Sequence, residues 1–453
     1  MNTLAETIGT YASTLKYEDL PSDVVHQVKR TILDTLGCAL GGYTSEPCQI
    51  ALDMAAGITS KQPATVLYGG QKTSLDLAVF ANGIMIRYLD FCDGYISVGS
   101  GRASDSIAAL ISSAEVTHST GRELIVVTAI TYEVFCRICD VMDNKSLGID
   151  HVTIGGIASV VGASRILGLT RKQIIEAINI MVAGNVTLNQ IRVGNVSKWK
   201  ACAYAHASRN AIFIAQLAAR GMTGPSPIFE GRDGFFKVVS RHPFELTFGG
   251  NGEPFRIMRC HLKRFPLGNF SQTVVTAALE ARSMIKDYRD IAGVHVRTTK
   301  SALGTMADSP EKWHPRNRET ADHSMPYTTA LALMYGTIDE HHFDEEYLCN
   351  PELLELMGRI KCSALDESKL RESEINPCEL EITLRSGESR SVNIEYHRGH
   401  WRNPMSDAEV DAKFRSLAGK MLPATQVDGL LQRLWKLEDL SDVQELVRMT
   451  VSS

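Results

Sequence analysis

Two short polar segments carry residue types that acid–base chemistry needs. In residues 87–93, Asp90 stands between two apolar neighbours, a setting that would raise the pKa of its carboxyl or demand a charged partner. In residues 150–153, His151 lies beside Asp150 just before an apolar helical pattern. Either Asp150 or Thr153 could cap that helix, and the imidazole of His151 would then lie at the N-terminal end of the helix. Each feature is compatible with a purely structural role as well as with catalysis.

Two further segments supply cations that could hold carboxylates. Lys198 and Lys200 enter a helical pattern rich in small residues, where lysines serve either as solvated side chains or as anion ligands at a helix N-terminus. Lys263 and Arg264 precede a proline turn, where the character of the chain changes from helical to mixed. Clefts between domains are frequent ligand sites. These four segments are denser in polar residues than their surroundings, and each of them alone is more often structural than functional.

The familiar cofactor motifs are absent. The glycine-rich stretch 249–252 lacks both the Walker spacing and the pattern of a dinucleotide-binding loop, and neither GxSxG in a hydrolase context nor HExxH occurs. The one close cysteine pair, Cys136 and Cys139, falls inside an apolar helical pattern and is interpreted as two buried thiols. The sequence therefore predicts neither a metal nor an organic cofactor.

Composition excludes several classes of protein. The chain has 453 residues, 44% of them hydrophobic and 22% charged, which is typical of a globular protein. A net charge of −5 argues against a nucleic-acid partner. The longest apolar stretches are interrupted well short of the ~20 residues that a membrane span needs. The first residues show no secretory signal pattern, so we expect a cytoplasmic protein without a membrane partner.

The elements that must position these residues are mostly helices. Apolar residues recur at helical spacing from about residue 3 to residue 221, and small residues are frequent, as in tightly packed helices. From about residue 260 the pattern changes. Residues 291–299 alternate like a strand, and residues 380–396 form two alternating runs around Ser386 and Gly387, which predicts a hairpin. Helical patterns return from residue 406.

The predicted fold is therefore mostly α with an α+β part. We expect a large all-helical domain in residues 1–259, a smaller α+β lid domain in residues 260–396, and a helical C-terminal segment in residues 397–453. The last segment should pack back on the first domain. Single hydrophobic cores stop growing near ~250–300 residues, which favours two domains.

Motifs spread over nearly the whole chain resemble one known family. The residues that carry this resemblance are 89–93 with 102–105, 150–153, 199–210, 220–225, 263–266, RETADHSMPY at 318–327 and NPMSDAEVDAKF at 403–414. The sequence is similar to the MmgE/PrpD family, which includes 2-methylcitrate dehydratase, cis-aconitate decarboxylase and iminodisuccinate epimerase. The resemblance implies a homodimer, a helical domain with an α+β lid, and a substrate that is a small di- or tricarboxylate, with no cofactor.

The resemblance also implies roles for individual residues. The family pocket would contain the catalytic residues Asp90, His151, Lys200 and Tyr327, with Tyr327 donating a hydrogen bond or proton. Histidine suits proton transfer near neutral pH. The implied substrate-binding residues are Lys263, Arg102, Ser104 and His323.

Three positions depart from the family pattern. Gly94 stands where a threonine is usual, and Arg102 stands where the family has a histidine commonly counted as catalytic. Arginine remains protonated and cannot replace that base. A second histidine that many members place after the proline turn is missing, and this chain has residues 267–270 (LGNF) there.

Three interpretations remain open. The first is a lyase, most simply a dehydratase, in which Arg102 clamps a carboxylate bidentately and His151 moves the proton. The second is a decarboxylase or an epimerase of a dicarboxylate on the same cationic pocket. The third is a family fold that binds without catalysis. The joint presence of His151, Lys200, Lys263 and Tyr327 favours the lyase.

Overall fold

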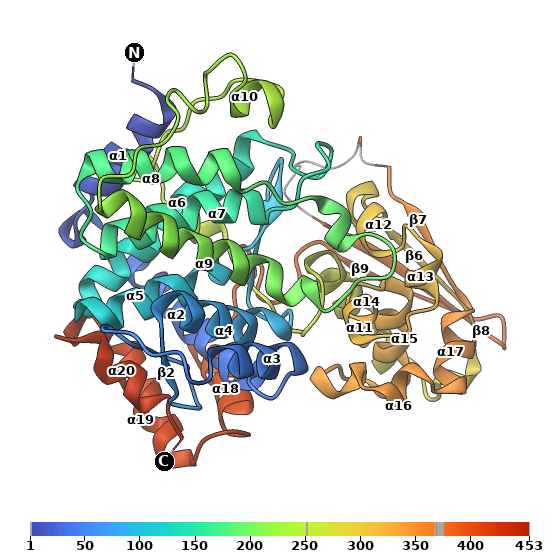
Figure 1. Cartoon of the computed structure of the whole chain (residues 1–453). Helices are drawn as coiled ribbons and strands as arrows, with labels where there is room; N and C mark the ends of the chain where they lie inside the picture. Colours follow the sequence, from blue (N-terminus) through green and yellow to red (C-terminus); the bar gives the residue numbers. More distant parts are fainter. Residues whose placement is uncertain (1, 251, 367, 369–375, 453) are drawn as a thin grey trace.

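The computed structural model of the chain describes residues 2–250, 252–366, 368 and 376–452. It divides into a helical body and a smaller part that contains a four-stranded sheet (Figure 1). The prediction of a mostly α protein with an α+β part is confirmed. None of the helices in the described ranges combines the length and the apolar character that crossing a membrane requires.

The helical body begins with ten helices. They are α1 (Leu4–Thr14), α2 (Ser22–Gly42), α3 (Glu46–Ala55), α4 (Leu75–Tyr88), α5 (Ile107–Thr117), α6 (Gly121–Val141), α7 (Val152–Ile166), α8 (Arg171–Gly184), α9 (Trp199–Ala219) and α10 (Phe235–Val238). In α2, residues Val24, Val28, Ile32 and Leu36 recur every four positions and are all buried, as an amphipathic helix requires. Polar caps fix the starts of several helices; Thr120 Oγ1, for example, accepts from the amide of Glu123 at the start of α6.

Five short strands occur in the body and at its junction with the lid, and the first four of them interrupt the segment that the sequence predicts to be almost entirely helical. These strands are β1 (Ala64–Thr65), β2 (Lys72–Thr73), β3 (Asp93–Ile96), β4 (Ser100–Gly101) and β5 (His261–Leu262). Strand β3 lies between β4 and β5, with Asp93 opposite Leu262. The link between α4 and α5 is buried, so its backbone groups need partners, and strand pairing supplies them. This small sheet brings residues 90–102 beside residues 261–263.

The lid contains a mixed sheet with helices packed on it. Its strands are β6 (Ile291–Thr298), β7 (Ile360–Ala364), β8 (Cys378–Leu384) and β9 (Ser389–Ile394), in the order β7-β6-β8-β9, with only β6 and β7 parallel. The predicted strand at 291–299 and the predicted hairpin at 380–396 are both confirmed. The helices are α11 (Gln272–Ser283), α12 (Lys300–Met306), α13 (Pro310–Trp313), α14 (Arg318–Ala321), α15 (Met325–Tyr335), α16 (Glu345–Leu348) and α17 (Pro351–Met357).

The last helices return to the body. Helices α18 (Asp407–Ala418), α19 (Ala424–Trp435) and α20 (Val443–Met449) contact α2 and α5. Helices α19 and α20 lie on the side away from the lid (Figure 1). One hydrophobic cluster combines residues from 4–262 with residues from 405–447, and a second lies within 265–394. We propose that these clusters are the cores of two domains, with the lid predicted at residues 260–396 inserted between segments 1–259 and 397–453. Cys260 and Leu262, at the start of the predicted lid, pack in the cluster of the body.

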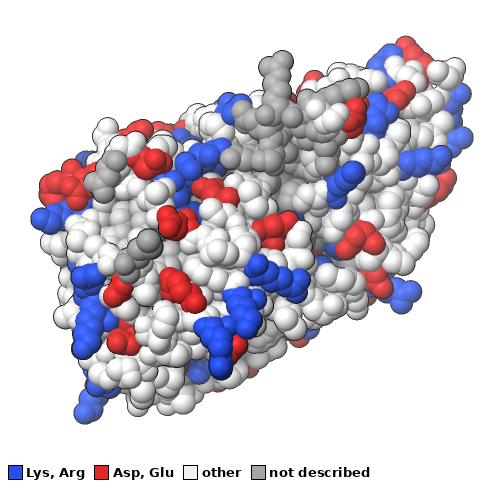
Figure 2. Space-filling view, turned by 90° about the horizontal axis from the view of Figure 1, so that it is seen from above, with Lys and Arg blue, Asp and Glu red and all other residues white. Residues whose placement is uncertain are grey.

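Charged side chains are mixed over the surface. In Figure 2, Lys and Arg alternate with Asp and Glu across the visible face, and neither sign gathers into one large patch. The distribution on this face agrees with the nearly balanced count of 47 basic and 52 acidic residues. The strong charges that matter for the site lie inside the molecule instead.

Candidate active site

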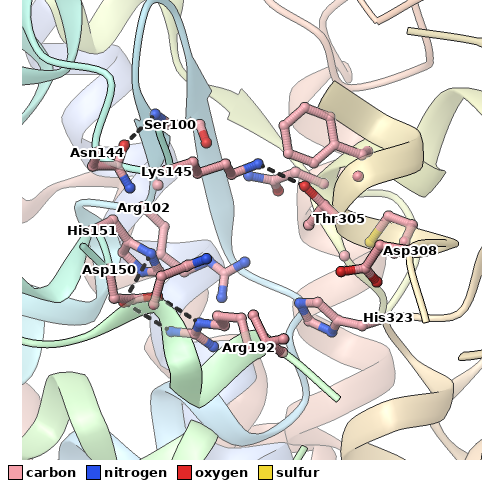
Figure 3. A pocket seen from close by; sticks show the side chains of 18 of the residues that line it. Ser100, Arg102, Asn144, Lys145, Asp150, His151, Arg192, Thr305, Asp308 and His323 are labelled. Atoms are coloured by element: carbon pink, nitrogen blue, oxygen red, sulfur yellow. Dashed lines mark hydrogen bonds and ion pairs between the residues drawn. The ribbon is translucent and has the colours of Figure 1, made fainter. Parts of the chain in front are cut away.

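A cavity of about 200 Å³ lies between the helical body and the lid (Figure 3). The body contributes Ser100, Gly101, Arg102, Asn144, Lys145, Asp150, His151, Asn189, Arg192 and Val193. The lid contributes Gly268, Asn269, Phe270, Gly304, Thr305, Met306, Asp308, Lys312 and His323. Most of these side chains are polar, and several are cationic, so the cavity suits a small anion.

His151 lines this cavity, and one of its two ring nitrogens has no hydrogen-bond partner among the described residues. The residue is buried at the start of α7, and its Nδ1 lies 3.2 Å from Oδ1 of Asp150. Its Nε2 is buried and has no hydrogen-bond partner among the described residues. Burial lowers the pKa of His151 well below its usual value, and the opposing effect of Asp150 does not compensate. The imidazole is therefore neutral at pH 7. A proton placed on Nδ1, beside Asp150, would leave Nε2 able to accept a second one.

Asp150 is held in place so that it can orient the imidazole. Arg192 donates from Nε to Oδ2 at 2.9 Å and from Nη2 to Oδ1 at 3.3 Å, and the amide of Val152 donates to Oδ1 at 3.1 Å. Burial alone would raise the pKa of Asp150, but Arg192 and His151 outweigh it and lower that pKa below its usual value. Asp150 thus stays ionised, and a carboxylate that fixes a histidine tautomer in this way prepares the other ring nitrogen as a base.

The backbone next to His151 is equally constrained. Gly101 in β4 lies so close that a Cβ atom there would sit 2.5 Å from Cβ of His151 and 2.7 Å from the ring of Phe135. Asn144 Oδ1 accepts from the amide of Ser100 at 3.1 Å and ties the same strand to the loop after α6. Strand, loop and helix start together fix the imidazole.

Arg102 and Arg192 offer unpaired donors beside His151. Nη2 of Arg102 lies 2.9 Å from Oδ1 of Asp90, whereas its Nε and Nη1 are buried without a hydrogen-bond partner among the described residues. Nη1 of Arg192 is also buried and has no hydrogen-bond partner among the described residues. Figure 3 shows both guanidinium groups facing the space next to His151. Buried donors without partners are unfavourable, and a carboxylate would satisfy them.

Behind Arg102 lies a group of buried charges that we call the charge cluster. It comprises Arg87, Asp90, Arg102, Asp105, Lys200, Lys263, Asp322 and His323. With both lysines protonated it holds four cations and three carboxylates. Burial lowers the pKa of Lys263 to about 7, so the cluster carries a surplus of positive charge when that amine is protonated. A low-dielectric interior strengthens the effect of this charge on an anion in the neighbouring cavity.

Asp90 is the centre of the charge cluster. Its carboxylate lies 3.1 Å from Nη2 of Arg87 and 3.7 Å from Nζ of Lys200, and it pairs closely with Lys263. Burial would raise the pKa of Asp90, but Arg102, Arg87 and Lys263 together lower it well below its usual value. Asp90 also has a φ of 52°, which is uncommon for any residue except glycine. The ion pairs hold this conformation, which suits a positioning role rather than proton donation.

The lid closes the charge cluster from the other side. Lys200 Nζ lies 2.5 Å and 2.6 Å from the two carboxylate oxygens of Asp322, and Nδ1 of His323 lies 2.5 Å from Oδ1 of the same residue. Burial lowers the pKa of His323 to about 3, so this ring is neutral as well.

Asp90, Asp322 and His323 are near enough to one another to hold a metal ion, but the four cations of the cluster oppose a metal cation there.

The structure places the eight predicted site residues in three locations. His151, Arg102 and His323 line the cavity. Asp90, Lys200 and Lys263 lie behind them in the charge cluster. The remaining two lie elsewhere. Ser104 donates from Oγ to Asp93 at 2.5 Å, and Tyr327 is buried in the lid core, where its hydroxyl donates to the carbonyl of His342 at 2.9 Å. Neither Ser104 nor Tyr327 lines the cavity, so we leave both out of the proposed mechanism.

The departures from the family pattern have structural counterparts. A Cβ atom at Gly94 would lie 2.4 Å from Nδ2 of Asn269 and 2.5 Å from Nε2 of His261, so a side chain at residue 94 would displace its neighbours. Phe270 lines the cavity and lies under the ammonium group of Lys145. Of the positions that depart from the family pattern, Arg102 and Phe270 line the cavity, whereas Gly94 does not.

Several cavity residues were not predicted from the sequence. Asn144 and Lys145 lie in the loop after α6, Arg192 lies in a 3₁₀ turn (Asn189–Arg192), and Lys312 lies in α13. These segments have no apolar periodicity that would fix where their side chains point. The one usable signal was the short run of polar residues at 143–146 (DNKS), shortly before the predicted Asp150 and His151.

Comparison with known proteins agrees with this architecture. The profile of the MmgE/PrpD N-terminal domain matches residues 6–247, and that of the MmgE/PrpD C-terminal domain matches residues 265–437. A 2-methylcitrate dehydratase of Cupriavidus necator is 25% identical, with 92% of this chain and 90% of the relative covered. A cis-aconitate decarboxylase of Homo sapiens is 25% identical, with 99% and 95% covered. An alkylcitrate dehydratase of a fungal species is 27% identical, with 85% and 81% covered. The two profiles span most of the chain, which therefore belongs to the MmgE/PrpD family.

Proposed function

We propose that this protein is a cofactor-independent hydro-lyase that dehydrates a small tricarboxylate related to 2-methylcitrate. The observation that carries the proposal is the free Nε2 of His151 beside unpaired guanidinium nitrogens of Arg102 and Arg192. A base next to carboxylate donors is what removal of a proton beside a carboxylate requires. Similarity to 2-methylcitrate dehydratases along almost the whole chain supports the same reaction class.

In the proposed reaction, Arg102 and Arg192 bind the carboxylate beside the reacting carbon. Nε2 of His151 removes the proton from that carbon, the electron pair forms the double bond, and the hydroxyl on the next carbon departs. The protonated imidazole then transfers the proton to the departing hydroxyl, which leaves as water. Asp150 stabilises the imidazolium between the two steps, as a paired carboxylate does for a histidine base.

The charge cluster stabilises the negative charge that develops on the substrate. Lys200 and Lys263 do not reach the cavity, and their ammonium groups are bound to Asp322 and Asp90. Their proposed role is to hold Asp90 and His323 in position and to supply the surplus positive field behind Arg102. Preorganised charge of this kind lowers the barrier without moving during the reaction.

The second candidate is decarboxylation of a tricarboxylate. It is favoured by the similarity to a cis-aconitate decarboxylase over 99% of this chain. Loss of carbon dioxide leaves a carbanion, which the same cations would stabilise and a protonated His151 would quench. Epimerisation of a dicarboxylate needs a proton exchange at one carbon and would use the same base. Binding without catalysis would not need a proton acceptor, so it gives no reason for the unpaired Nε2 of His151.

Proton NMR in D₂O distinguishes these reactions. The purified protein is incubated separately with 2-methylcitrate, citrate, cis-aconitate and iminodisuccinate. An unsaturated product from either hydroxy acid is the expected result. Citrate should lose one methylene signal and gain a vinylic proton. 2-Methylcitrate should lose either its methine signal, with the methyl resonance moving to that of a methyl group on a double bond, or its methylene signal, with a new vinylic proton. Conversion of cis-aconitate with release of carbon dioxide would establish the decarboxylase, and deuterium exchange without elimination would establish an epimerase. No change with any of the four acids would overturn the proposed substrate class.

A homodimer in solution is also proposed. Ile50 and Met54 on α3 and Phe213 on α9 are large apolar side chains exposed by 52%, 61% and 57%, and a partner subunit would bury such surface. Light scattering after size exclusion is expected to give twice the chain mass of 49.8 kDa. A monomeric mass would contradict this expectation.

The cytoplasmic location remains a prediction that cell fractionation would check.

A further inference from the structure

Lys145 spans the cavity from the body to the lid. It lies in the loop after α6, and Figure 3 shows its side chain extending across the cavity toward Thr305 at the end of α12. Nζ donates to Oγ1 of Thr305 at 2.9 Å and lies 3.8 Å from the centroid of the Phe270 ring. Both partners are uncharged, so the ammonium group is positioned without being neutralised.

The other lysines of the site have carboxylate partners. Lys200 pairs with Asp322, Lys263 with Asp90, and Lys312 with Asp308. In the described part of the chain, no carboxylate lies within ion-pair distance of Lys145. A cation inside a cavity without a counterion is unfavourable, and an anionic ligand would remove that penalty.

The electrostatics of the cavity agree with this arrangement. Burial lowers the pKa of Lys145 to about 7; Asp143 and Asp150 oppose this shift, whereas Lys312 and Arg192 add to it. The empty site thus contains the ammonium and the amine in comparable amounts near neutral pH. A carboxylate bound next to Nζ would favour the ammonium form.

Lys145 also lies apart from the two arginines. In Figure 3, the guanidinium groups of Arg102 and Arg192 lie next to His151, while the Lys145 side chain crosses above them. A substrate carboxylate beside the reacting carbon would occupy the arginines, which leaves Lys145 for a carboxylate at another end of the molecule.

We propose that Lys145 binds the distal carboxylate of the substrate and makes the site selective for tricarboxylates over dicarboxylates. This inference rests on the proposed function, because it assigns one further contact to the same substrate. The ring of Phe270 holds the ammonium by a cation–π contact and provides no competing hydrogen-bond acceptor. Thr305 supplies a neutral acceptor that the ligand can displace or share.

The test is a binding measurement that does not depend on turnover. Propane-1,2,3-tricarboxylate and 2-methylbutanedioate differ by one distal carboxylate, and neither carries the hydroxyl that elimination needs. Their affinities are measured by calorimetry at pH 7 for the wild-type protein and for Lys145→Gln, Lys145→Arg and Lys172→Gln. Lys172 is an exposed lysine on α8 and serves as the matched control. Urea unfolding checks that all variants are folded.

We expect Lys145→Gln to lose affinity for the tricarboxylate and to keep its affinity for the dicarboxylate. The wild-type protein should bind the tricarboxylate more tightly, and Lys145→Gln should weaken that binding by about 10- to 100-fold, while the dicarboxylate changes less than about twofold. Lys145→Arg should recover part of the affinity, and Lys172→Gln should behave as wild type.

Other outcomes overturn the inference in distinguishable ways. Equal weakening of both acids by Lys145→Gln, or no weakening of either, would remove the selectivity role while leaving the proposed reaction intact. A wild-type protein that binds both acids equally would do the same. If the wild-type protein bound neither acid, the substrate class of the proposed function would fail together with this inference.

Discussion

Nδ1 of His151 lies 3.2 Å from Oδ1 of Asp150, and the two residues are neighbours in the chain as well as partners in space. The pair exists because α7 begins immediately after it, so that the Asp150 carboxylate can accept from the first helical amide while it faces the imidazole. Arg192 completes the arrangement from a separate turn. A base built in this way depends on the exact placement of its backbone, and this leads to the first prediction.

Gly101→Ala should impair catalysis by displacing His151. The new Cβ atom would lie 2.5 Å from Cβ of His151, so the imidazole must shift. Misplacement of a catalytic group by about 1 Å can cost roughly 10²-fold in rate. We expect kcat to fall by about that factor, with a smaller change in KM, in steady-state assays of the turned-over acid. Gly184→Ala is the control, since nothing lies within 4 Å of a Cβ there. Wild-type kcat in Gly101→Ala would contradict the assigned geometry.

Arg102→Ala should weaken substrate binding. Its Nε and Nη1 are unpaired in the buried site, and each charge-assisted hydrogen bond to a carboxylate contributes about 1.5–3 kcal/mol. KM is therefore expected to rise by about 10- to 100-fold. Arg232→Ala, a change at a side chain that is 90% exposed, provides the control. Unchanged affinity for every turned-over acid would remove the clamp role from Arg102.

Asp90→Asn should destabilise the folded protein. The substitution leaves Arg87, Arg102 and Lys263 buried with less counter-charge, and breaking a buried ion pair typically costs about 3–5 kcal/mol. Urea unfolding should show this loss in the free energy of unfolding. Asp233→Asn, at an exposed carboxylate, should change it by less than about 0.5 kcal/mol. Wild-type stability in Asp90→Asn would show that the charge cluster is not held by this carboxylate.

Acid should destabilise the protein through buried histidines. Burial lowers the pKa of His323 to about 3, that of His397 to about 4 and that of His400 to about 3. Unfolded histidines titrate near ~6.5, so between about pH 6.5 and pH 4 the unfolded chain binds more protons than the folded one. Stability should therefore fall on acidification across this window, by up to ~1.4 kcal/mol per pH unit for each histidine. Urea midpoints at pH 7.5, 6 and 5 test this, and equal midpoints would contradict it.

Sequence patterns predicted the fold best where they were long and periodic. The helices of the body, the strand at 291–299 and the hairpin at 380–396 each span several repeats of their period, and the structure has them. The pattern missed β3, β4 and β5, which have two to four residues each. Their pairing is imposed by burial of the link after α4 and not by local propensity.

The candidate site was predictable only where a motif marked it. The resemblance drew attention to His151, Arg102 and His323, all of which line the cavity. It also pointed to Tyr327, but α15 turns that residue into the lid core, a direction that no motif specifies. Lys145 could not be predicted, because an aperiodic loop positions it and its neighbours come from the other domain.

The central claim is that His151 removes a proton beside a carboxylate and that a hydroxyl then leaves. Proton NMR of 2-methylcitrate in D₂O with the wild-type protein and with His151→Gln tests it most directly, with His118→Gln at an exposed histidine as the control. The account predicts an unsaturated product from the wild-type and control proteins, seen as loss of the methine or methylene signal of 2-methylcitrate, and a rate lower by roughly 10²–10⁴ for His151→Gln. A folded His151→Gln protein that forms the product at the wild-type rate would contradict the account.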